Sequence, residues 1–485
     1  MIAMIAQLLI NATGVVAAFL FMYGLKRMSS PVTAPSGIFV AGVGMLAAVL
    51  ASFLYAFGVD AETRPYVAVN TGLAAVALLI GGGIAFWSGR KAKMTSMPQM
   101  VALYNGMGGG AAGAIAAVEL FGNRAHGFSA LIVTLVGALI GAVSLSGSLI
   151  AWAKLEGILK KPTRIPGQQF LNGAVLLGTL ALGGYIVFVS KGGETPLADA
   201  PRWIALFFGG ALILGILMTL PIGGADMPVV ISVYNACTGL AVGLEGFVLG
   251  NPALMIAGMV VGAAGTLLTV LMAKAMNRSV AAVLFSRFGP AAGGKKAKGT
   301  PPGALKPVEA SDAGIFMRYA SSVIIVPGYG LAVAQAEGKL YEFVKLLQAA
   351  GVGVKFAIHP VAGRMPGQMD VLLAEAGVPY DLIFQLDDIN DEFKDTDVAL
   401  VIGANDVVNP AARTDKTSPI FGMPILNADQ AKKVYVVKRG KGKGYADIVN
   451  GLFYEDNCNM VYGDAQAVLV QMIEAVRGLG THAAA

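Results

Sequence analysis

Nine long apolar stretches fill the first 275 residues of the chain and limit its possible folds more than any other feature. A helix needs about 20 apolar residues to cross the hydrocarbon core of a bilayer. Only 13% of all residues are charged, compared with about 25% in soluble domains. We therefore predict nine transmembrane helices, near residues 3–24, 37–58, 67–88, 99–120, 129–153, 168–190, 203–221, 228–249 and 252–274.

The basic residues between these stretches predict the orientation of the helices. The loops that follow the first, third, fifth, seventh and ninth stretches together carry eleven lysines and arginines. The alternate loops carry these four: Arg64, Arg124, Lys191 and Arg202. Because basic loops stay on the cytoplasmic side, the N-terminus is expected outside and the C-terminal part in the cytoplasm. No basic residue precedes Lys26, so we expect the first stretch to be a spanning helix and not a cleaved signal peptide.

Composition argues against several functional classes. The formal net charge is +6, but the basic residues flank apolar stretches and form no continuous stripe, so no nucleic-acid partner is expected. The two cysteines, Cys237 and Cys458, lie in very different segments, which excludes a disulfide framework and a cysteine-based metal site. The three histidines are scattered along the chain. No metal site is therefore predicted.

A short motif occurs twice among the apolar stretches. Met97-Pro98 is followed by Asn105, and Met227-Pro228 by Asn235, with an offset of 130 residues between the copies. Proline is tolerated at a helix start, so each asparagine is expected about two turns inside the membrane, as a buried amide. Polar groups at that depth usually face a bundle interior or a wet cavity. Helix-to-helix packing and a proton pathway explain the two asparagines equally well.

Two acids accompany the repeated motif. Asp226 lies at the mouth of the second copy, and Glu119 lies near the far end of the stretch that holds the first copy. Because charged groups inside a membrane are costly, such acids are candidates for a proton pathway. We add both acids to Asn105 and Asn235 as candidate residues of that pathway.

The character of the chain changes after the ninth stretch. Residues 289–307 are rich in glycine, proline and lysine, a composition typical of a flexible basic linker. We predict a transmembrane domain at residues 1–280, a linker at 281–307 and a nucleotide-binding domain at 308–485. The linker can tether the last domain beneath the membrane.

Residues 322–336 predict a strand, a glycine-rich turn and a helix. The β-branched run Val323 to Val326 reads as a buried parallel strand. Gly328 and Gly330 then form a Gly-x-Gly turn, and an alanine-rich helix is expected from there to about Ala350. This arrangement binds the pyrophosphate of a dinucleotide, because the second glycine lets a phosphate approach the backbone at a helix N-terminus. Val333 occupies the third small position of the fingerprint, which weakens the match.

Further short apolar runs predict a doubly wound α/β fold. Strands are expected at 354–358, 381–384, 398–402, 424–426, 434–437 and 460–462, with helical segments between them. Parallel strands joined by such crossovers form a Rossmann-like sheet, whose ligands bind outside the carboxyl ends of the strands. The loops at those ends are therefore expected to line the site, at residues 359–367, 403–410, 438–445 and 463–465.

The same loops predict which dinucleotide is bound. An NAD-binding fold carries an acid near the end of its second strand, but this chain has His359 there. Lys438 and Arg439 directly follow a later strand and offer a charged fork for a phosphate. A solvated basic turn is the alternative reading of this pair. Together these features favour NADP over NAD.

Several motifs now resemble one family, the β subunits of proton-translocating NAD(P) transhydrogenases, over essentially the whole chain. The soluble part carries Pro-Gly-Tyr-Gly-Leu-Ala-Val-Ala-Gln-Ala at 327–336, Ile-His-Pro-Val-Ala-Gly-Arg at 358–364, Leu-Leu-Ala-Glu-Ala at 372–376 and Val-Ile-Gly-Ala-Asn-Asp-Val-Val-Asn-Pro at 401–410. The membrane part carries Gly-Gly-Ala-Asp-Met-Pro-Val-Val at 223–230 and Lys-Ala-Met-Asn-Arg-Ser at 274–279.

The resemblance implies an activity and its setting. Hydride passes from NADH, held by a partner α subunit, to NADP held by this chain, and protons flowing inward through the membrane helices drive the reaction, which is Re/Si-specific. The α subunit contributes the NAD(H) domain and further membrane helices, and two αβ units form a dimer in the bacterial inner membrane, surrounded by lipid. No residue here needs to act as a catalytic acid or base, because the hydride chemistry belongs to the cofactors.

The resemblance also implies contacts to NADP(H). Gly328, Tyr329, Gly330 and Val333 meet the nicotinamide and pyrophosphate half, and Lys438 with Arg439 holds the 2′-phosphate. Arg364 meets phosphate, and a lid closes over the cofactor at Gly444 and Tyr445. The remaining expected contacts are Val361, Ala362, Gly363, Gly403, Ala404, Asn405, Asp406, Gly463, Asp464 and Ala465.

Two positions depart from the family pattern. Many relatives carry a membrane histidine where this chain has Asn105, and a neutral amide cannot titrate near pH 7. Either water and Asn105 conduct the proton, or a partner helix supplies the titrating group. Gly440 stands where the family often has a serine after the Lys-Arg pair, so one hydroxyl contact to the 2′-phosphate is lost.

Two rival functions remain open at this point. A transporter or channel gated by NADP, without a redox role, also fits a nucleotide domain attached to membrane helices. A tethered oxidoreductase that passes electrons to quinone is a further alternative, but the chain has no cysteine cluster or evident flavin motif.

Overall fold

The chain forms two compact units in the computed structural model. One unit comprises Met1–Pro221 and Val230–Thr269, and the other comprises Ile222–Val229 and Val270–Ala485. The structure describes residues 2–30, 32–54, 66–122, 127–159, 163, 165–190, 200–223, 226–285, 303–363, 367–418, 420–440, 442, 444, 446 and 448–482.

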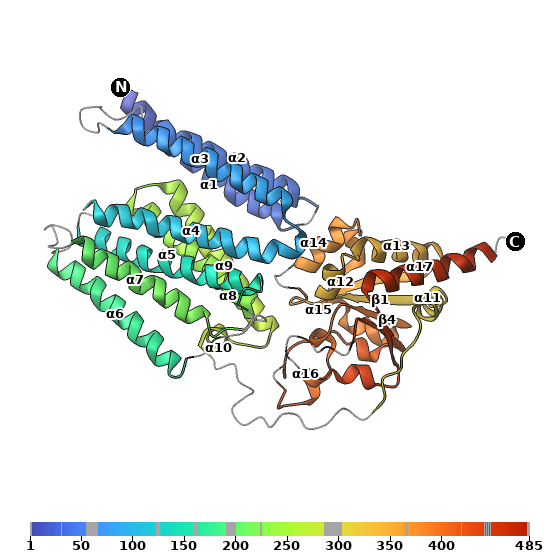
Figure 1. Ribbon diagram of the computed structural model, residues 1–485. Helices are drawn as coiled ribbons and strands as arrows, with labels where there is room; N and C mark the ends of the chain where they lie inside the picture. Colours follow the sequence, from blue (N-terminus) through green and yellow to red (C-terminus); the bar gives the residue numbers. More distant parts are fainter. Residues whose placement is uncertain are drawn as a thin grey trace. The chain divides into compact units, whose positions relative to one another are not determined.

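Long apolar helices make up the membrane part of the chain (Figure 1). Within the described residues, nine helices are long and apolar enough to cross a bilayer, so the predicted spans are confirmed. Their bounds are α1 Ile2–Met28, α2 Ala34–Phe53, α3 Val67–Lys91, α4 Met97–Phe121, α5 Phe128–Leu155, α6 Gln168–Val189, α7 Ala200–Thr219, α8 Met227–Val248 and α9 Pro252–Ala275. Proline lies within the first turn of α4 and α8, where its missing N–H leaves no helical hydrogen bond unmade.

Glycines allow the closest helix pairs in this bundle to touch at the backbone. A Cβ added at Gly141 of α5 would lie 2.7 Å from the carbonyl oxygen of Gly109 and 2.9 Å from the nitrogen of Gly113, both on α4. A Cβ added at Gly258 of α9 would likewise collide with the backbone of Gly243 on α8. Small residues drive membrane helices together in this way, because close packing replaces the missing hydrophobic effect.

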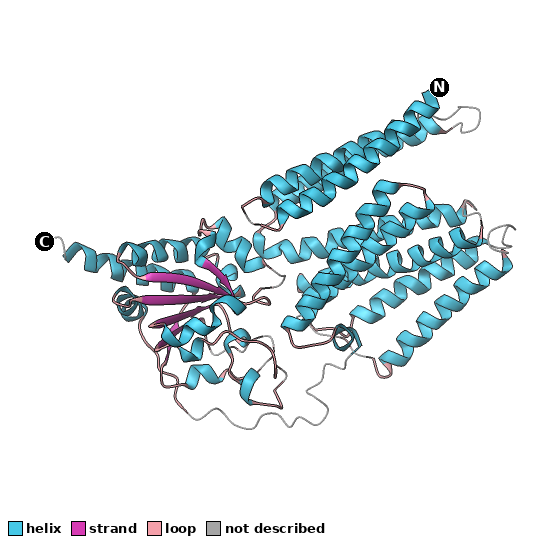
Figure 2. Ribbon diagram, turned by 180° about the vertical axis from the view of Figure 1, so that it is seen from behind, coloured by secondary structure: helices cyan, strands magenta, loops and turns pink. Residues whose placement is uncertain are grey.

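The second unit is built on a parallel sheet, drawn in magenta in Figure 2. Six strands lie in the order β3-β2-β1-β4-β5-β6, and every described neighbour pair is parallel. The bounds are β1 Ser322–Pro327, β2 Gly353–Ile358, β3 Ile383–Gln385, β4 Val398–Ile402, β5 Lys433–Lys438 and β6 Cys458–Tyr462. The predicted doubly wound fold is confirmed, and its order reverses between β1 and β4, where such sheets bind ligands.

Helices flank this sheet and complete its core. α17 (Ala465–His482) packs against α11 (Ala310–Arg318), α12 (Tyr329–Ala334) and α13 (Glu337–Ala349). Shorter helices complete the unit, namely α14 Gln368–Glu375, α15 Leu386–Ile389 and α16 Ala411–Thr414. Ile324, Val326, Val401 and Val436, on the central strands, are at most 2% exposed and lie in one apolar cluster. This buried sheet brings the loops at the carboxyl ends of its strands to one edge.

Two predictions about local structure are wrong. The helix expected to run from the glycine turn to Ala350 is divided into α12 and α13, because Gln335 adopts a left-handed conformation with φ of 52° and ends the first helix. Residues 424–426 form no strand. β4 already pairs with β1 on one side and β5 on the other, so no edge of it is free for this segment.

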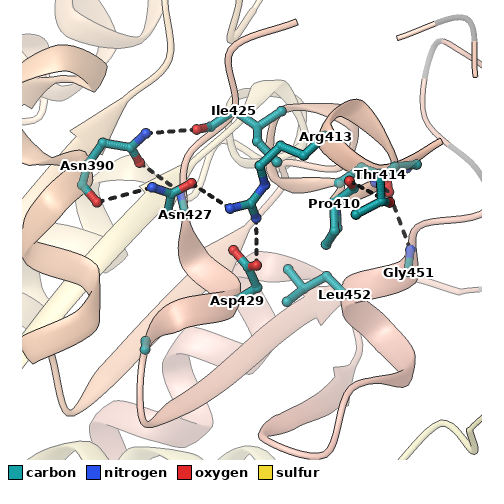
Figure 3. Close-up of polar contacts among 12 residues, drawn as sticks. Asn390, Pro410, Arg413, Thr414, Ile425, Asn427, Asp429, Gly451 and Leu452 are labelled. Carbon is teal, nitrogen blue, oxygen red and sulfur yellow. Dashed lines mark hydrogen bonds and ion pairs between the residues drawn. The ribbon is translucent and has the colours of Figure 1, made fainter. Parts of the chain in front are cut away.

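Side chains hold the 424–429 segment in place of a β ladder (Figure 3). The Asn390 amide donates to the carbonyl oxygen of Ile425 at 3.0 Å, and its side-chain oxygen accepts from the Asn427 backbone at 2.7 Å. Arg413 donates to the side chains of Asn427 and Asp429, at 3.1 and 2.5 Å. Backbone polar groups must be satisfied when they are buried. The Asn390 side chain satisfies two of them here, and Arg413 holds the side chains of Asn427 and Asp429.

The segment predicted as a linker has ordered ends. α10 occupies Val280–Phe285, just beyond α9. At the other end, Pro307 forms a parallel bridge with Met460 of β6, and the backbone nitrogen of Val308 donates to the Met460 oxygen at 2.9 Å. Residues 286–302, the central part of the predicted linker, lie outside the described residues.

Candidate functional site

The glycine turn after β1 lies directly against the loop after β4. The backbone nitrogen of Gly328 donates to the Ile402 oxygen at 2.9 Å, and that of Gly330 donates to the Gly403 oxygen at 3.0 Å. A Cβ added at Gly328 would lie 2.5 Å from the Cα atom of Ala404. The backbone of the loop after β4 therefore leaves no room for a side chain at Gly328 or Gly330. In this structure the Gly330 amide, expected to face a phosphate, is bonded to Gly403.

The rest of the turn starts the short helix α12. Tyr329 is its first residue, and Val333, on its second turn, is 43% exposed. Gly403 has a φ of 75°, a conformation that favours glycine. The turn predicted from the sequence is thus present, and it is joined to the predicted loop at Gly403 and Ala404.

His359, at the end of β2, anchors the next loop. Its Nδ1 atom accepts a hydrogen bond from the Val361 nitrogen at 3.1 Å, so Nε2 carries the proton and donates to the Pro424 oxygen at 2.7 Å. The side chain is 1% exposed, and burial lowers the pKa of His359 to about 4. This neutral histidine positions the loop that continues through Ala362 and Gly363. Arg364 lies outside the described residues.

Two buried asparagines fix the loop after β4. The Asn450 amide donates to the backbone oxygen and the side-chain oxygen of Asn405. Asn409, fully buried, accepts from the nitrogen of Ala411 at 3.1 Å and donates to the Val449 oxygen at 3.2 Å. The predicted loop residues Asn405 and Asp406 are therefore tied to the segment that follows β5.

Asp406 also joins the loop after β4 to the segment that follows β5. Its Oδ2 atom accepts a hydrogen bond from the Ala446 nitrogen at 2.9 Å, and a Cβ added at Gly444 would collide with its carboxylate. The predicted lid thus contacts the loop after β4 at Gly444. Tyr445, the other predicted lid residue, is not among the residues that the structure describes.

Two cations lie at the end of β5. The Lys438 nitrogen lies 4.5 Å from the centre of the Phe453 ring, and burial lowers the pKa of Lys438, while the nearby Asp406 carboxylate opposes that shift. Arg439 is exposed. Within the described residues, neither side chain forms an ion pair. A planar guanidinium beside an ammonium can bind a phosphate through several charge-assisted hydrogen bonds.

The last predicted loop begins α17. The Gly463 nitrogen donates to the Lys438 oxygen at 3.0 Å, so this loop lies beside the cationic pair. Asp464 caps the helix, because its Oδ1 atom accepts from the Gln466 nitrogen at 3.1 Å. Ala465 is buried at the first turn. Among the described residues, the predicted loops at 328–330, 403–406, 438–440 and 463–465, together with Gly444, thus form one connected edge of the sheet.

In the membrane bundle, Asn105 is the centre of a polar cluster. Its amide donates to the Ser148 hydroxyl of α5 at 3.0 Å, and the Thr238 hydroxyl of α8 donates to its backbone oxygen at 3.3 Å. The hydroxyls of Thr238 and Ser144 are 2.6 Å apart. The Oδ1 atom of Asn105 is buried and accepts no hydrogen bond from the described residues.

The other predicted pathway residues lie apart from this cluster. Asn235 is only half-buried, which corrects the expectation of two buried amides, and its side chain makes no hydrogen bond with a described residue. Asn235 follows Tyr234 directly and precedes Thr238 by three residues, and both of these neighbours contact Ser144 of α5. Asp226 is 1% exposed and accepts two hydrogen bonds of 3.2 Å from Arg278. Glu119, on α4, is half-buried.

Several polar residues of these clusters were not predicted from the sequence. Ser144, Ser148 and Thr238 are ordinary residues of apolar stretches, and only their spatial contact with Asn105 reveals them. Asn450 likewise lacks a local motif. Glu245 of α8 carried a usable signal, because an acid within an apolar span is a candidate for function.

Comparison with known proteins identifies similar chains. The family model described as "NAD(P) transhydrogenase beta subunit" matches residues 10–475. A protein named NAD(P) transhydrogenase subunit beta, from Rhodospirillum rubrum, is 43% identical over 476 residues, which cover 96% of this chain and 98% of the relative. The protein of the same name from one strain of that species gives the same identity and coverage.

Proposed function

Because the chain belongs to the NAD(P) transhydrogenase beta subunit family, we propose that it binds NADP(H) and exchanges hydride with NAD(H) on a partner α subunit. In this proposal the reaction is Re/Si-specific and is coupled to inward proton movement through the membrane helices. The C-terminal unit supplies the cofactor site, and the helical bundle supplies the proton pathway.

The cationic pair at the end of β5 is the observation that carries the choice of cofactor. Lys438 and Arg439 form no ion pair with a described residue, and the end of β2 carries the neutral His359 where NAD-binding folds place an acid. The pair therefore suits the 2′-phosphate that distinguishes NADP from NAD. Gly463, hydrogen-bonded to Lys438, borders the same place.

The glycine turn and its neighbouring loop complete the proposed site. Gly328, Tyr329, Gly330 and the loop from Gly403 to Asp406 would hold the nicotinamide and pyrophosphate half. The Gly330 amide is bonded to Gly403 in this structure, so a phosphate contact there requires the β4 loop to move. The nicotinamide supplies the hydride chemistry when the cofactor is bound, and the residues of this chain bind and orient it.

The polar cluster around Asn105 supports the proposed proton pathway. Ser148, Asn105, Thr238 and Ser144 form a continuous run of hydrogen-bonding groups across α4, α5 and α8. None of these side chains titrates near neutral pH, so a titrating histidine on a partner helix is proposed beside Asn105. The unfilled acceptor at Asn105 Oδ1 is suited to such a donor. Asp226, paired with Arg278, would lie at the cytoplasmic mouth.

The proposed assembly follows from the beta-subunit family. An α subunit carries the NAD(H) domain and further membrane helices, and two αβ units form a dimer in the bacterial inner membrane. The N-terminus lies outside, and the nucleotide-binding unit lies in the cytoplasm.

Inverted membrane vesicles that contain both subunits test this function. NADPH formation from NADH should require the α subunit and should accelerate when the vesicle lumen is made acidic, because protons then flow to the cytoplasmic face. An uncoupler should abolish the acceleration without stopping the reaction. NADP-dependent ion flux without any hydride transfer would instead favour a nucleotide-gated transporter.

A further inference from the structure

A carboxyl group is completely buried inside the membrane bundle, in the last turn of α8 (Met227–Val248). Glu245, on α8, is 0% exposed, and neither of its carboxyl oxygens has a hydrogen-bond partner among the described residues. Buried acids are normally paired or hydrogen-bonded, because a charged carboxylate away from water is very costly. An acid held without a partner in this position needs another explanation.

The bundle makes room for this side chain. A Cβ added at Gly137 of α5 would collide with the Oε1 atom of Glu245, so the carboxyl group lies directly against the α5 backbone. Glycine at 137 is thus what allows an acid of this length to fit between α5 and α8. On α4, Gly108 contacts Thr238 of α8. Glu119 follows Gly108 by three helical turns on the same helix. Because α4 and α8 both run antiparallel to α5, Glu119 lies toward the same end of the bundle as Glu245.

Glu245 shares a helix face with the polar cluster described above. It follows Thr238 by seven residues, which is two helical turns or about 10 Å along the axis. Thr238 contacts Ser144 and the Asn105 backbone. The glycine contact between Gly141 and Gly113 lies between this cluster and the level of Gly137 on α5. The acid therefore extends the polar run toward the far end of α4.

Few other ionisable groups are available near Glu245. In the sequences of α5 and α9, the charged residues are Lys154 and Lys274, both in the last turn. α4 contributes Glu119 and Tyr104, and α8 contributes Tyr234 and Cys237. The loop between α4 and α5 contains Arg124 and His126, whose placement the structure does not describe. No cation among the described residues neutralises Glu245, so its neutral, protonated form is the one that this pocket can hold.

We propose that Glu245 is a proton-holding residue of the membrane bundle, which stores a proton on its carboxyl group and exchanges it with Glu119. In each exchange one carboxyl O–H bond breaks and another forms, with no change in electron count. The pair stands at the end of the polar run opposite to Asp226. The inference rests on the proposed function for the direction in which the proton moves, but the stored proton itself does not depend on it.

Infrared spectroscopy of the purified αβ complex tests the stored proton without any turnover. The wild-type complex at neutral pH should show the carbonyl-stretch band of a protonated carboxylic acid, and ¹³C-labelling of glutamate should shift this band. The band should disappear in Glu245→Gln, an isosteric change, and remain in Glu156→Gln, which removes an exposed acid just beyond α5. Absence of the band from the wild type, or its persistence in Glu245→Gln, would overturn the inference.

Proteoliposomes with an enclosed pH-sensitive dye test the exchange. During hydride transfer, Glu245→Gln should take up no more protons than liposomes without enzyme, whereas Glu156→Gln should match the wild type. Glu245→Asp keeps the acid and should retain both the infrared band and part of the uptake, even if Glu245→Gln fails to assemble. Full uptake by Glu245→Gln would overturn the inference. A wild type that transfers hydride without proton uptake would instead refute the proposed coupling, while the infrared result would stand.

Discussion

The side-chain amide of Asn450 donates two hydrogen bonds to Asn405, to its backbone oxygen at 2.9 Å and its side-chain oxygen at 3.1 Å. The Asn450 side-chain oxygen accepts from the Leu452 nitrogen at 3.0 Å. One side chain thus joins the loop after β4 to the segment after β5. Both segments belong to the proposed cofactor site.

Two replacements of Asn450 distinguish its hydrogen bonds to Asn405 from its hydrogen bond to Leu452. Asn450→Asp keeps the acceptor for Leu452 but loses both donors to Asn405, and Asn450→Ala loses all three bonds. Each change should lower the free energy of unfolding of the predicted nucleotide-binding domain, residues 308–485, by about 1–3 kcal/mol, because buried acceptors are left unsatisfied. Urea denaturation measures the loss, and exposed Gln466→Ala serves as the control. Unchanged stability in both Asn450 variants would show that the amide network does not hold the loop.

Loss of the Arg439 charge should discriminate between the two dinucleotides. A charge-assisted hydrogen bond contributes about 1.5–3 kcal/mol, so Arg439→Ala should weaken NADP binding about ten- to a hundredfold. NAD binding should barely change, because NAD lacks the 2′-phosphate. Isothermal calorimetry on the predicted nucleotide-binding domain, residues 308–485, checks both affinities, and Lys345→Ala on α13 removes an equal charge elsewhere. Equal losses for NADP and NAD would refute the role of Arg439.

The buried histidine makes the stability of the same unit depend on pH. The pKa of His359 is lowered to about 4 by burial, whereas an unfolded chain has a histidine pKa near 6.5. The unfolded state therefore binds the proton first, and stability is full above about pH 6.5 and falls as the pH drops toward 4. The full loss is about 3 kcal/mol.

Urea denaturation at a series of pH values measures this dependence. His359→Gln should remove the part of the slope that lies between pH 6.5 and 4, because glutamine does not titrate there. Glutamine differs in shape from histidine and cannot reproduce the hydrogen bond to the Pro424 oxygen in full. The free energy of unfolding at pH 7 should therefore also fall. An identical slope in wild type and variant would assign the pH dependence to other groups.

Asn235 tests the membrane pathway. Asn235→Leu should depress proton-coupled turnover while leaving NADP binding to the C-terminal unit intact, because the two functions belong to separate units. Turnover in proteoliposomes and NADP calorimetry measure the two effects, with Asn11→Leu, an exposed amide on α1, as the matched control. Loss of folding would favour a packing role, and unchanged turnover with unchanged proton uptake would remove Asn235 from the pathway.

Reporter fusions test the predicted orientation. Fusions after Arg64 or Lys191 should report the outside, and fusions after Lys93, Lys161 or Arg278 the cytoplasm, because basic residues concentrate in the latter loops. Periplasmic and cytoplasmic reporter enzymes give opposite signals at each point. A cytoplasmic signal after Lys191 would mean that the spans before this residue have been miscounted.

The sequence predicted the long-range architecture well where one physical signal dominates. Every apolar stretch became a helix, because length and hydropathy alone decide what can cross a bilayer. β4 was predicted at its observed bounds, because a continuous run of buried apolar residues suits a central parallel strand. The site loops followed from the same parallel order, since the carboxyl ends of parallel strands share one edge.

The remaining features depend on contacts that no local pattern contains. The segment at 424–426 is short and apolar like a strand, but Asn390 and His359 bind its backbone from 35 and 65 residues away in the chain. Gln335 gave no sign that it would end α12, because left-handed backbone is uncommon for that residue type. Asn450 and Asn405 are 45 residues apart in the chain and come into contact only in the folded structure.

The close contact between the β1 turn and the β4 loop also limits how this protein can evolve. Gly328 has an extended backbone, with φ of −136°, that any residue can adopt, and the backbone of Ala404 is what excludes a side chain there. A single change at Gly328 is therefore blocked by a neighbour 76 positions later in the chain. Alanine could enter only after the loop at 403–404 had shifted or shortened, so the two segments can change only in a fixed order, loop first and turn second.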